Sequence, residues 1–546
     1  MLEPAAVDAL FRPDLPETDH WERRYPPRRL PEGAEVTRFA PSPTGHLHIG
    51  GLYTAAVSRA LARQSGGVHL LRVEDTDQAR RVAGAAAAFV RQLTAFGLPP
   101  DEGGTDGGDW GPYLQSDRGD VYLSHIRALM RQGRAYPCFC DRGRLARITE
   151  EQRASRSPLG YYGRWALCRT LTPEQAADRV RSGEPYVVRF RCPPGLPGRV
   201  RFEDRIRGSV TTQDNGNDVV LLKSSQDQLP LPTYHLAHVV DDHLMRVTLV
   251  VRGEEWLSST PLHLQLHTAL GFGRPAYAHL APLMKAEGGN RRKLSKRKDP
   301  EASVDFYLTA GYPPAAVQHY LRGLANARLM DAPTHEALAA RLRTADMSPA
   351  GPLLDLPKLR SISRESIAGL AAAEVYRQLC NWAAEFDAEL HQVLVRRAEL
   401  AHSAIAVSRN AAGHPRKDLV RWSDFRDRYG FFFPELFGPV PAPDDARFGA
   451  LSPDLVRRVA ADFAARYTHP DTPASWLGGL RDLAERHGFA PDTRAHRLAP
   501  SRYAGPTGEV VNVVRVCLTG SARSPDLFEV VRVLGRDEVL RRLAVG

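Results

Sequence analysis

The segment 35–74, EVTRFAPSPTGHLHIGGLYTAAVSRALARQSGGVHLLRVE, decides the fold of this chain. Its two ends, 35–40 and 68–74, are predicted to be short strands, the second of them buried, and 52–64 carries small and apolar residues at helical spacing. A turn of small residues at 45–51 joins the first strand to the helix. A strand, a turn, a helix and a second strand form the first unit of a Rossmann-like parallel sheet.

The turn between the first strand and the helix has the chemistry of a phosphate site. The free N–H groups and the dipole of a helix N-terminus attract phosphate, and Gly50 and Gly51 let a nucleotide approach the backbone. His48 and His46 can each donate a hydrogen bond to phosphate. A lone histidine is more often a surface residue, but the strand–turn–helix context favours nucleotide binding.

A second motif, Lys293-Leu294-Ser295-Lys296-Arg297, stands out by its lysines. Lysine occurs seven times among the 73 basic residues, and three of the seven are Lys293, Lys296 and Lys298. Lysine is a mobile point charge, whereas arginine is a rigid planar fork. A loop that places one charge on a moving phosphate therefore favours lysine. The alternative is a solvated basic loop.

Together and in this order, the two motifs resemble the nucleotide-binding signatures of class I aminoacyl-tRNA synthetases, and the chain around them resembles the glutamyl-tRNA synthetases. The segments that carry the resemblance are 38–45, 72–77, Tyr234 with 239–243, and 251–260. The resemblance implies a multidomain α/β protein. Its Rossmann-like parallel-sheet catalytic domain carries an α+β insertion and is followed by all-helical C-terminal domains.

The resemblance implies an enzyme that joins glutamate and ATP, with Mg²⁺, to glutamyl-adenylate and passes the glutamyl group to the 3′ end of tRNA(Glu). Lys296 would be catalytic, assisted by Lys293 and His48. The residues implied for ATP are His46, His48, Gly50, Gly51, Glu254, Lys293, Ser295 and Lys296.

The residues implied for glutamate are Arg38, Ser42, Glu74, Tyr234 and Arg252. Their chemistry suits this substrate, because two arginines can clamp carboxylates bidentately and a glutamate can accept from the ammonium group. His238 stands where the family is expected to have asparagine, and its role stays open.

Cys138, Cys140 and Cys168 form a candidate zinc site, because thiolates bind zinc well. Many glutamyl-type synthetases have such a site in this insertion, with a fourth ligand that varies. Tyr162 or Cys192 can supply it here. The alternative is a set of inert buried cysteines.

The chain is expected to divide into several domains, which its length also favours. These are an N-terminal extension at 1–35, the two halves of the catalytic domain at 36–135 and 230–285, an acceptor-binding insertion at 136–229, a stem-contact region with the KLSKR loop at 286–350, and helical anticodon-binding domains at 351–546.

Several elements are predicted by pattern. Strands are expected at 186–191, 234–242 and 245–253, and helices at 314–325, 365–395, 453–467 and 525–543. Thr172, Ser452 and Ser524, each followed by proline, read as helix caps. The mixed basic and aromatic run 416–433 fits either base stacking or an ordinary helix with aromatic core residues.

Composition sets the remaining expectations. The net charge of +10 fits a polyanion partner and does not indicate which polyanion. No run is long enough for a membrane span, and the N-terminus lacks an apolar signal core, so we expect a cytoplasmic protein with no membrane association. We expect a monomer. The alternatives are a glutaminyl-tRNA synthetase, a duplicate synthetase that supplies a specialised pathway, and a catalytically silent tRNA-binding paralogue.

Overall fold

The structure, a computed structural model, describes residues 2–104, 107–194, 198–214, 216–226, 230–295, 297–409 and 415–543. The chain folds into two compact units. The first, the N-terminal unit, consists of Met1–Phe306 with Gln318–Asp355, and the second, the C-terminal unit, of Tyr307–Val317 with Leu356–Gly546. No helix among the described residues is both long and apolar enough to cross a membrane.

The predicted opening unit is present. Strands β1 (Val36–Phe39), β2 (Val68–Leu71) and β3 (Glu102–Gly103) pair in parallel in that order. Helix α3 (Ile49–Gln64) connects β1 to β2, and Gly66 follows it with a φ of 74°. The helix begins three residues earlier than its pattern predicted, because the side chain of His48 caps it.

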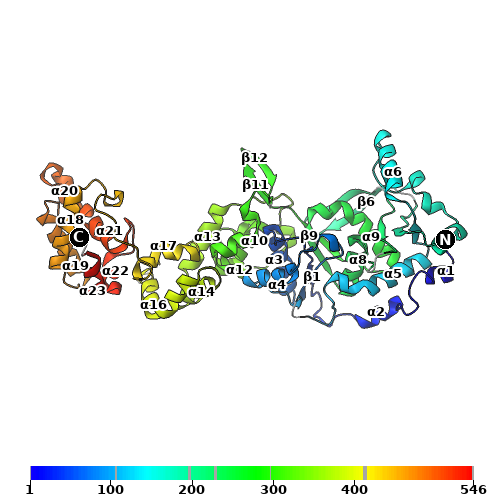
Figure 1. The fold of residues 1–546 in the computed structure, drawn as a ribbon, viewed down its shortest axis with the longest axis horizontal. Coiled ribbons are helices and arrows are strands. Elements are labelled where there is room, and N and C mark those ends of the chain that lie inside the picture. The colour runs from blue at the N-terminus through cyan, green and yellow to red at the C-terminus, as the bar shows by residue number, and fades with distance from the viewer. Residues whose placement is uncertain are drawn as a thin grey trace. The chain divides into compact units, whose positions relative to one another are not determined.

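The second half of the sheet continues beside β1. The amide of Thr248, just before β9 (Leu249–Gly253), donates to Val36 O at 2.9 Å, so β9 lies next to β1 (Figure 1). Strand β10 (Ala276–Leu280) pairs in parallel with β9, and its other edge meets the hairpin of β6 (Gly198–Asp204) and β7 (Gly208–Asp214).

The strand predicted at 234–242 is wrong. These residues form helix α8 (Tyr234–Leu244), whose Leu236, Ala237, Val239 and Val240 are all buried. A helix buried on most of its surface has a nearly continuous apolar run, which periodicity alone does not distinguish from a buried strand. The neighbouring prediction, 245–253, is confirmed in its second part by β9.

The insertion forms its own antiparallel sheet of β4 (Ala135–Cys138), β5 (Val187–Phe190) and β8 (Val220–Leu222). Helices α6 (Arg142–Ala154) and α7 (Pro173–Arg181) accompany it. Thr172 caps α7 in a capping box with Gln175, as predicted.

Residues 1–35 fold against helix α5 of the N-terminal unit. Helices α1 (Pro4–Asp8) and α2 (Thr18–Arg24) contact α5 (Gly119–Arg131), and Val7 and Tyr25 are buried. The remaining helices of this unit are α4 (Ala85–Ala95), α9 (Thr260–Leu270) and α12 (Thr334–Ala339). Helices α10 (Val304–Ala310) and α11 (Pro314–Ala325) contribute residues to both units.

In the second unit the residues that the structure describes form helices and no strand. These are α13 (Leu356–Ala368), α14 (Ala372–Phe386), α15 (Ala388–Arg396), α16 (Ala398–Val407), α17 (Phe425–Tyr429), α18 (Pro453–Arg466), α19 (Pro473–Arg486), α20 (Thr493–Leu498), α21 (Thr507–Thr519), α22 (Leu527–Leu534) and α23 (Arg536–Leu543).

Two of the predicted long helices are in fact broken. The stretch 365–395 spans parts of three helices, because Asp387 leaves the helical conformation and caps α15. The stretch 525–543 forms two helices, which Gly535 separates with a φ of 78°. The first of them, α22, is capped by Asp526 and not by the predicted Ser524. The Ser452-Pro453 start of α18 is confirmed.

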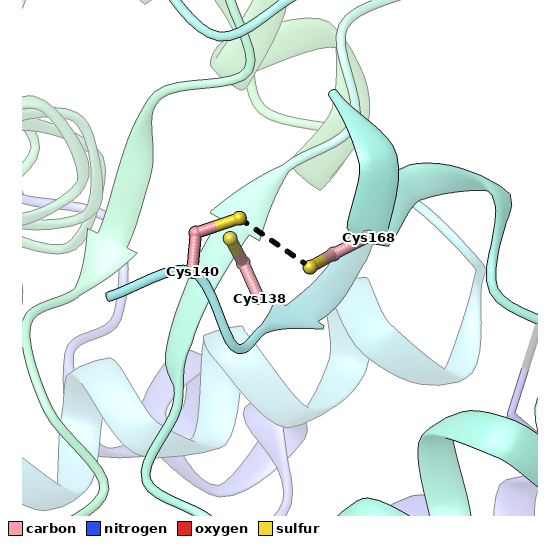
Figure 2. A group of neighbouring side chains, drawn as sticks. All are labelled: Cys138, Cys140 and Cys168. Carbon is pink, nitrogen blue, oxygen red and sulfur yellow. Dashed lines mark hydrogen bonds between the residues drawn. The ribbon is translucent and has the colours of Figure 1, made fainter. Parts of the chain in front are cut away.

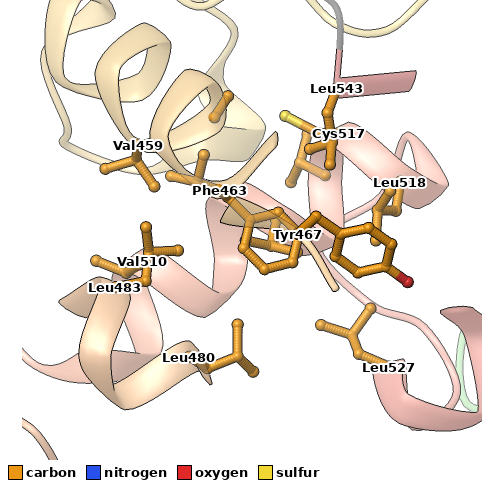
Figure 3. Close-up of a cluster of buried hydrophobic side chains, with 14 of the residues drawn as sticks. Val459, Phe463, Tyr467, Leu480, Leu483, Val510, Cys517, Leu518, Leu527 and Leu543 are labelled. Carbon is orange, nitrogen blue, oxygen red and sulfur yellow. The ribbon is translucent and has the colours of Figure 1, made fainter. Parts of the chain in front are cut away.

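The described residues of this unit form two apolar cores. One gathers the aromatic residues of 416–433, of which Trp422, Phe425 and Phe432 are almost fully buried. The prediction of aromatic core residues in that run is confirmed, so these rings are not free to stack on bases. The run is not one helix, because only Phe425–Tyr429 is α-helical. The second core packs α18, α19 and α21 through residues such as Phe463 and Leu483 (Figure 3).

Candidate active site

A cavity of about 710 Å³ opens at the carboxyl ends of four parallel strands. Ala40 follows β1, Glu74 follows β2, and Gly253 and Leu280 end β9 and β10, and all four residues line it. Open α/β sheets bind their ligands at this edge.

The N-terminus of α3 forms one wall. The amide of Gly50 donates to His48 Nδ1 at 2.9 Å, and His48, Gly50 and Gly51 all line the cavity. A Cβ at Gly51 would lie 3.0 Å from Leu47 and 3.3 Å from Phe39, so this glycine is needed for packing as well as for access. His46 is outside the lining. It is 80% exposed, with its Nδ1 3.0 Å from Asp305 Oδ2.

The second motif follows a hairpin of β11 (Met284–Glu287) and β12 (Asn290–Lys293). Lys293 lines the cavity, and Lys296 lies outside the described residues. Ser295 does not line the cavity, and its amide donates to Asp299 Oδ2 at 2.9 Å.

Asp299 anchors this loop, and sequence reasoning missed it. It accepts two hydrogen bonds from Arg292, at 2.6 and 2.7 Å, and one from Lys285 at 2.9 Å. Arg292 foremost, and then Lys285, holds the pKa of Asp299 well below its usual range. A single carboxylate thus ties the middle of the motif, at Ser295, to the hairpin residues Lys285 and Arg292.

The five residues implied for glutamate all line the cavity. Arg38 donates from Nε to Asp242 Oδ1 at 3.1 Å and from Nη1 to Val251 O at 3.2 Å. Arg72 bridges Asp242, at 2.6 Å, to Glu74, at 3.0 Å. Sequence reasoning missed Arg72 and Asp242, although both lie inside segments that it singled out.

Beside these arginines, Glu74 is buried and Tyr234 is partly buried. Burial raises the pKa of Glu74, although the charges of Arg72 and Arg38 oppose the rise. Burial also raises the pKa of Tyr234 well above its usual value, so its hydroxyl stays protonated. The Tyr234 ring stacks on His238 at 5.4 Å between centroids and lies 4.3 Å from Trp256.

Arg252 is held differently from Arg38. It donates from Nε to His279 Nε2 at 3.0 Å and from Nη2 to Thr260 Oγ1 at 2.9 Å. Its Nη1 lies 3.3 Å from His238 Nε2 and 3.1 Å from His263 Nδ1. The site thus combines a helix N-terminus, a lysine and two buried arginines, which suits a nucleotide and an anionic small molecule.

Residues 35–345 match the family model described as tRNA synthetases class I (E and Q), catalytic domain. The chain belongs to this family of class I tRNA synthetases. Residues 505–546 match an anticodon binding domain.

Similar proteins span nearly the whole chain. The glutamate–tRNA ligase of Acetivibrio thermocellus is 39% identical over 95% of this chain and 95% of its own length. That of Clostridium beijerinckii is 37% identical over 98% of both chains. The crystal structure of a glutamate tRNA ligase from Elizabethkingia meningosepticum, in complex with its amino acid, matches with a TM-score of 0.74 at 26% identity, and covers 93% of this chain and 98% of that chain.

In this class I synthetase Glu254, one of the residues implied for ATP, does not line the cavity. Glu254 pairs with Arg207, and the next residue, Glu255, lines the cavity. Lys223, which sequence reasoning also missed, lines the cavity and donates to Thr76 O at 2.5 Å.

Three of the four cysteines of the insertion, Cys138, Cys140 and Cys168, lie close together, as Figure 2 shows. Their sulfur atoms all lie within 4.8 Å of one another, and Cys140 Sγ is 3.7 Å from Cys168 Sγ. Four sulfurs around one zinc, each at about 2.3 Å, are about 3.8 Å apart, so the group fits zinc. Hydrogen bonds from Cys140 and then Cys168 lower the pKa of Cys138, which favours a thiolate there.

Neither residue considered for the fourth ligand joins this group. Tyr162 donates its hydroxyl to Pro158 O at 2.6 Å, and Cys192 donates its thiol to Gln265 Oε1 at 3.3 Å. Tyr161 is the tyrosine beside the sulfurs, with its hydroxyl 3.3 Å from Cys140 Sγ.

Proposed function

We propose that this chain is a glutamate–tRNA ligase that activates glutamate with ATP and transfers it to the 3′ end of tRNA(Glu). One observation carries the assignment to this site: Arg38, Arg252 and Glu74 line the same cavity as the N-terminus of α3 and Lys293. Two guanidinium groups match the two carboxylates of glutamate, and a carboxylate matches its ammonium.

In this proposal the nucleotide phosphates lie against His48, Gly50 and Gly51, where the helix N-terminus favours anions. An oxygen of the glutamate α-carboxylate attacks the α-phosphorus, the bond to pyrophosphate breaks, and glutamyl-adenylate forms. Lys293 and Lys296 stabilise the charge that develops on the phosphates. Mg²⁺ supplies further neutralisation when it is bound. A hydroxyl of the terminal ribose then attacks the carbonyl carbon and AMP leaves.

The second unit would hold the tRNA. The match of residues 505–546 to an anticodon binding domain supports this assignment, and the net charge of +10 of the whole chain fits a polyanion partner. Because the aromatic side chains of 416–433 are largely buried, we assign tRNA binding in this unit to basic groups on its surface.

The test is a charging assay with labelled glutamate or glutamine on purified tRNA(Glu) and tRNA(Gln). We expect glutamate on tRNA(Glu), and a rate about 10²- to 10³-fold lower for Lys296→Ala, because its charge acts mainly in the transition state. Failure of the native protein to charge tRNA(Glu) would refute the function. An unchanged rate for Lys296→Ala would refute only the role of that lysine.

We also propose that Cys138, Cys140 and Cys168 bind one zinc ion as a structural site. Cys192→Ser is the matched control, because its thiol lies outside the group of three. Metal analysis of protein purified without chelators should find zinc in the native protein and in Cys192→Ser, and little in Cys140→Ser. A native protein without zinc would reject the site.

A further inference from the structure

Every hydrogen bond that Arg252 makes goes to an uncharged acceptor. The guanidinium is 4% exposed, and its partners are three imidazoles, the hydroxyl of Thr260 and, at 3.5 Å, the carbonyl of Trp256. None of the ion pairs found among the described residues includes Arg252. By contrast, Arg38 pairs with Asp242, and Arg72 pairs with Asp242 and Glu74.

The neighbours of each imidazole define which nitrogen carries the proton. His279 Nδ1 lies 2.6 Å from Asp204 Oδ2, so Nδ1 donates and Nε2 accepts from Arg252. His238 Nδ1 lies 3.2 Å from Asp242 Oδ2 and 3.4 Å from Arg38 Nη2. The shorter contact, to the carboxylate, favours the proton on Nδ1, so Nε2 faces Arg252 as an acceptor.

The third imidazole completes the set. His263 Nδ1 faces Arg252 at 3.1 Å, and its Nε2 faces His235 Nδ1, also at 3.1 Å. A neutral His263 protonated on Nε2 satisfies both contacts. All three rings therefore fit one arrangement in which they are neutral and each presents a bare nitrogen to the guanidinium.

We infer that His238, His263 and His279 are positioning residues that orient Arg252 without neutralising it, so that its positive charge is kept for a carboxylate of the amino-acid substrate. This inference rests on the proposed glutamate–tRNA ligase function. A carboxylate in place of one of these rings would hold Arg252 equally well, but it would satisfy the charge that the substrate has to meet. Using neutral acceptors thus favours an anionic ligand by leaving a buried cation without a counter-charge.

The rings of His238, His263 and His279 form a cage of imidazoles around Arg252. They accept its hydrogen bonds only while they are uncharged, since a protonated ring loses its acceptor and repels Arg252. Burial foremost, and then neighbouring cations, lowers the pKa of His238 and that of His263 well below the ordinary histidine value. Burial also lowers the pKa of His279, which Asp204 opposes. The titratable and charged groups that face the cage are Arg38, Arg72, Asp204, Arg207, Tyr234, His235, Asp242, His267 and Tyr277.

The test compares His263→Asn with His263→Asp. The two side chains have the same shape and both can place an oxygen near the position of Nδ1, so they differ mainly in charge. We expect the KM for glutamate in the charging reaction to be at least tenfold higher in His263→Asp than in His263→Asn. The KM for ATP should differ much less between them. Thermal unfolding of both variants shows whether either one has lost its fold.

Equal glutamate KM values in two folded variants would overturn the inference, as would a lower value in His263→Asp. If His263 had only a structural role, the charge of Arg252 would not matter for glutamate binding. The aspartate of His263→Asp would then add an ion pair to Arg252 without raising the KM for glutamate above that of His263→Asn. If the native protein charges no glutamate at all, the proposed function fails, and that result is distinct from a native enzyme in which the two variants behave alike.

A second measurement needs no variant. The glutamate KM of the native enzyme should show no rise at the pKa of an ordinary imidazole as the pH falls from 8 to 6, because burial lowers the pKa of each of the three rings below that value. A rise centred near pH 6.5, the value of an ordinary imidazole, would mean that a ring of the cage titrates in the working range, and would overturn the inference.

Discussion

The two units bury different chemistry. The first buries ionised groups in contact with one another, as in the series Arg38, Asp242, Arg72 and Glu74. In the second, the buried polar or charged residues among those described are Ser363, Ser408, Thr519 and Arg542, and the cores are otherwise apolar. Burying charge is costly unless each group is paired. The comparison teaches that the first unit keeps buried charged groups where they can contact a substrate. The second unit is held together mainly by the packing of apolar side chains.

Acidification should give the largest difference in stability between the two units. Burial lowers the pKa of His69 to about 3 and those of His125, His235 and His267 to about 4, and all four lie in the first unit. In the unfolded chain the pKa of each histidine is about 6.5, so the unfolded chain binds protons before the folded protein does as the pH falls. Stability of the first unit is therefore lost between pH 6.5 and about 4, by up to about 1.4 kcal/mol per pH unit for each imidazole.

The second unit has no buried histidine among its described residues and should lose protection at lower pH. Hydrogen exchange of peptides from both units, measured from pH 7 to pH 4, checks the order of opening. If peptides of the second unit opened first, buried imidazoles would not control the acid stability of this protein.

Asp242→Asn should give the largest effect of a single substitution. Burial alone would raise the pKa of Asp242, but Arg38 and Arg72 hold it below its usual value, so the folded protein contains the carboxylate. The amide keeps the shape and removes the charge that both arginines share. We expect a loss of about 3–5 kcal/mol in the free energy of unfolding of the first unit. Urea unfolding followed by hydrogen exchange in α8 measures it, and a loss below about 1 kcal/mol would contradict the comparison.

Leu483→Ala tests the second unit by the opposite chemistry. Leu483 is fully buried in the core shown in Figure 3, and its truncation should cost about 3 kcal/mol through lost burial and a cavity. Glutamyl-adenylate formation at 25 °C should be retained, while charging of tRNA should fail at a lower temperature than in the native protein. Equal loss of both steps at every temperature would show that this core supports the catalytic cavity as well.

The sequence predicted best where structure is local. The strand–turn–helix–strand unit of 35–74 is confirmed because its pattern and its glycines act over a few residues. The cap of α7 at Thr172 is confirmed for the same reason. The strand predicted at 234–242 is wrong because burial by distant segments, which no local pattern records, made a helix apolar on most of its surface.

The site was predictable in its direct contacts and not in their support. Arg38 and Arg252 were named as a pair, yet the first forms an ion pair with Asp242, which it shares with Arg72, and the second is held by imidazoles from α8, α9 and β10. That difference depends on residues brought together from distant parts of the chain, so spacing does not reveal it. Asp299 escaped notice for a related reason, since its role arises from a hairpin that returns to the loop.

Lys417→Ala should have the smallest effect on the free energy of unfolding. It tests the comparison with the same kind of contact as in the first unit, an ion pair, at an exposed position. Lys417 pairs with Glu365 at 2.6 Å, as close as Arg72 lies to Asp242, but the two side chains are 50% and 55% exposed. Water already solvates both charges, and holding two long side chains in one geometry costs entropy. The pair should therefore contribute about 0–1 kcal/mol. A double-mutant cycle with Glu365→Ala, in low and high salt, measures the coupling. A coupling above about 2 kcal/mol would mean that exposure does not separate the two kinds of ion pair, and the contrast between the units would then need another cause.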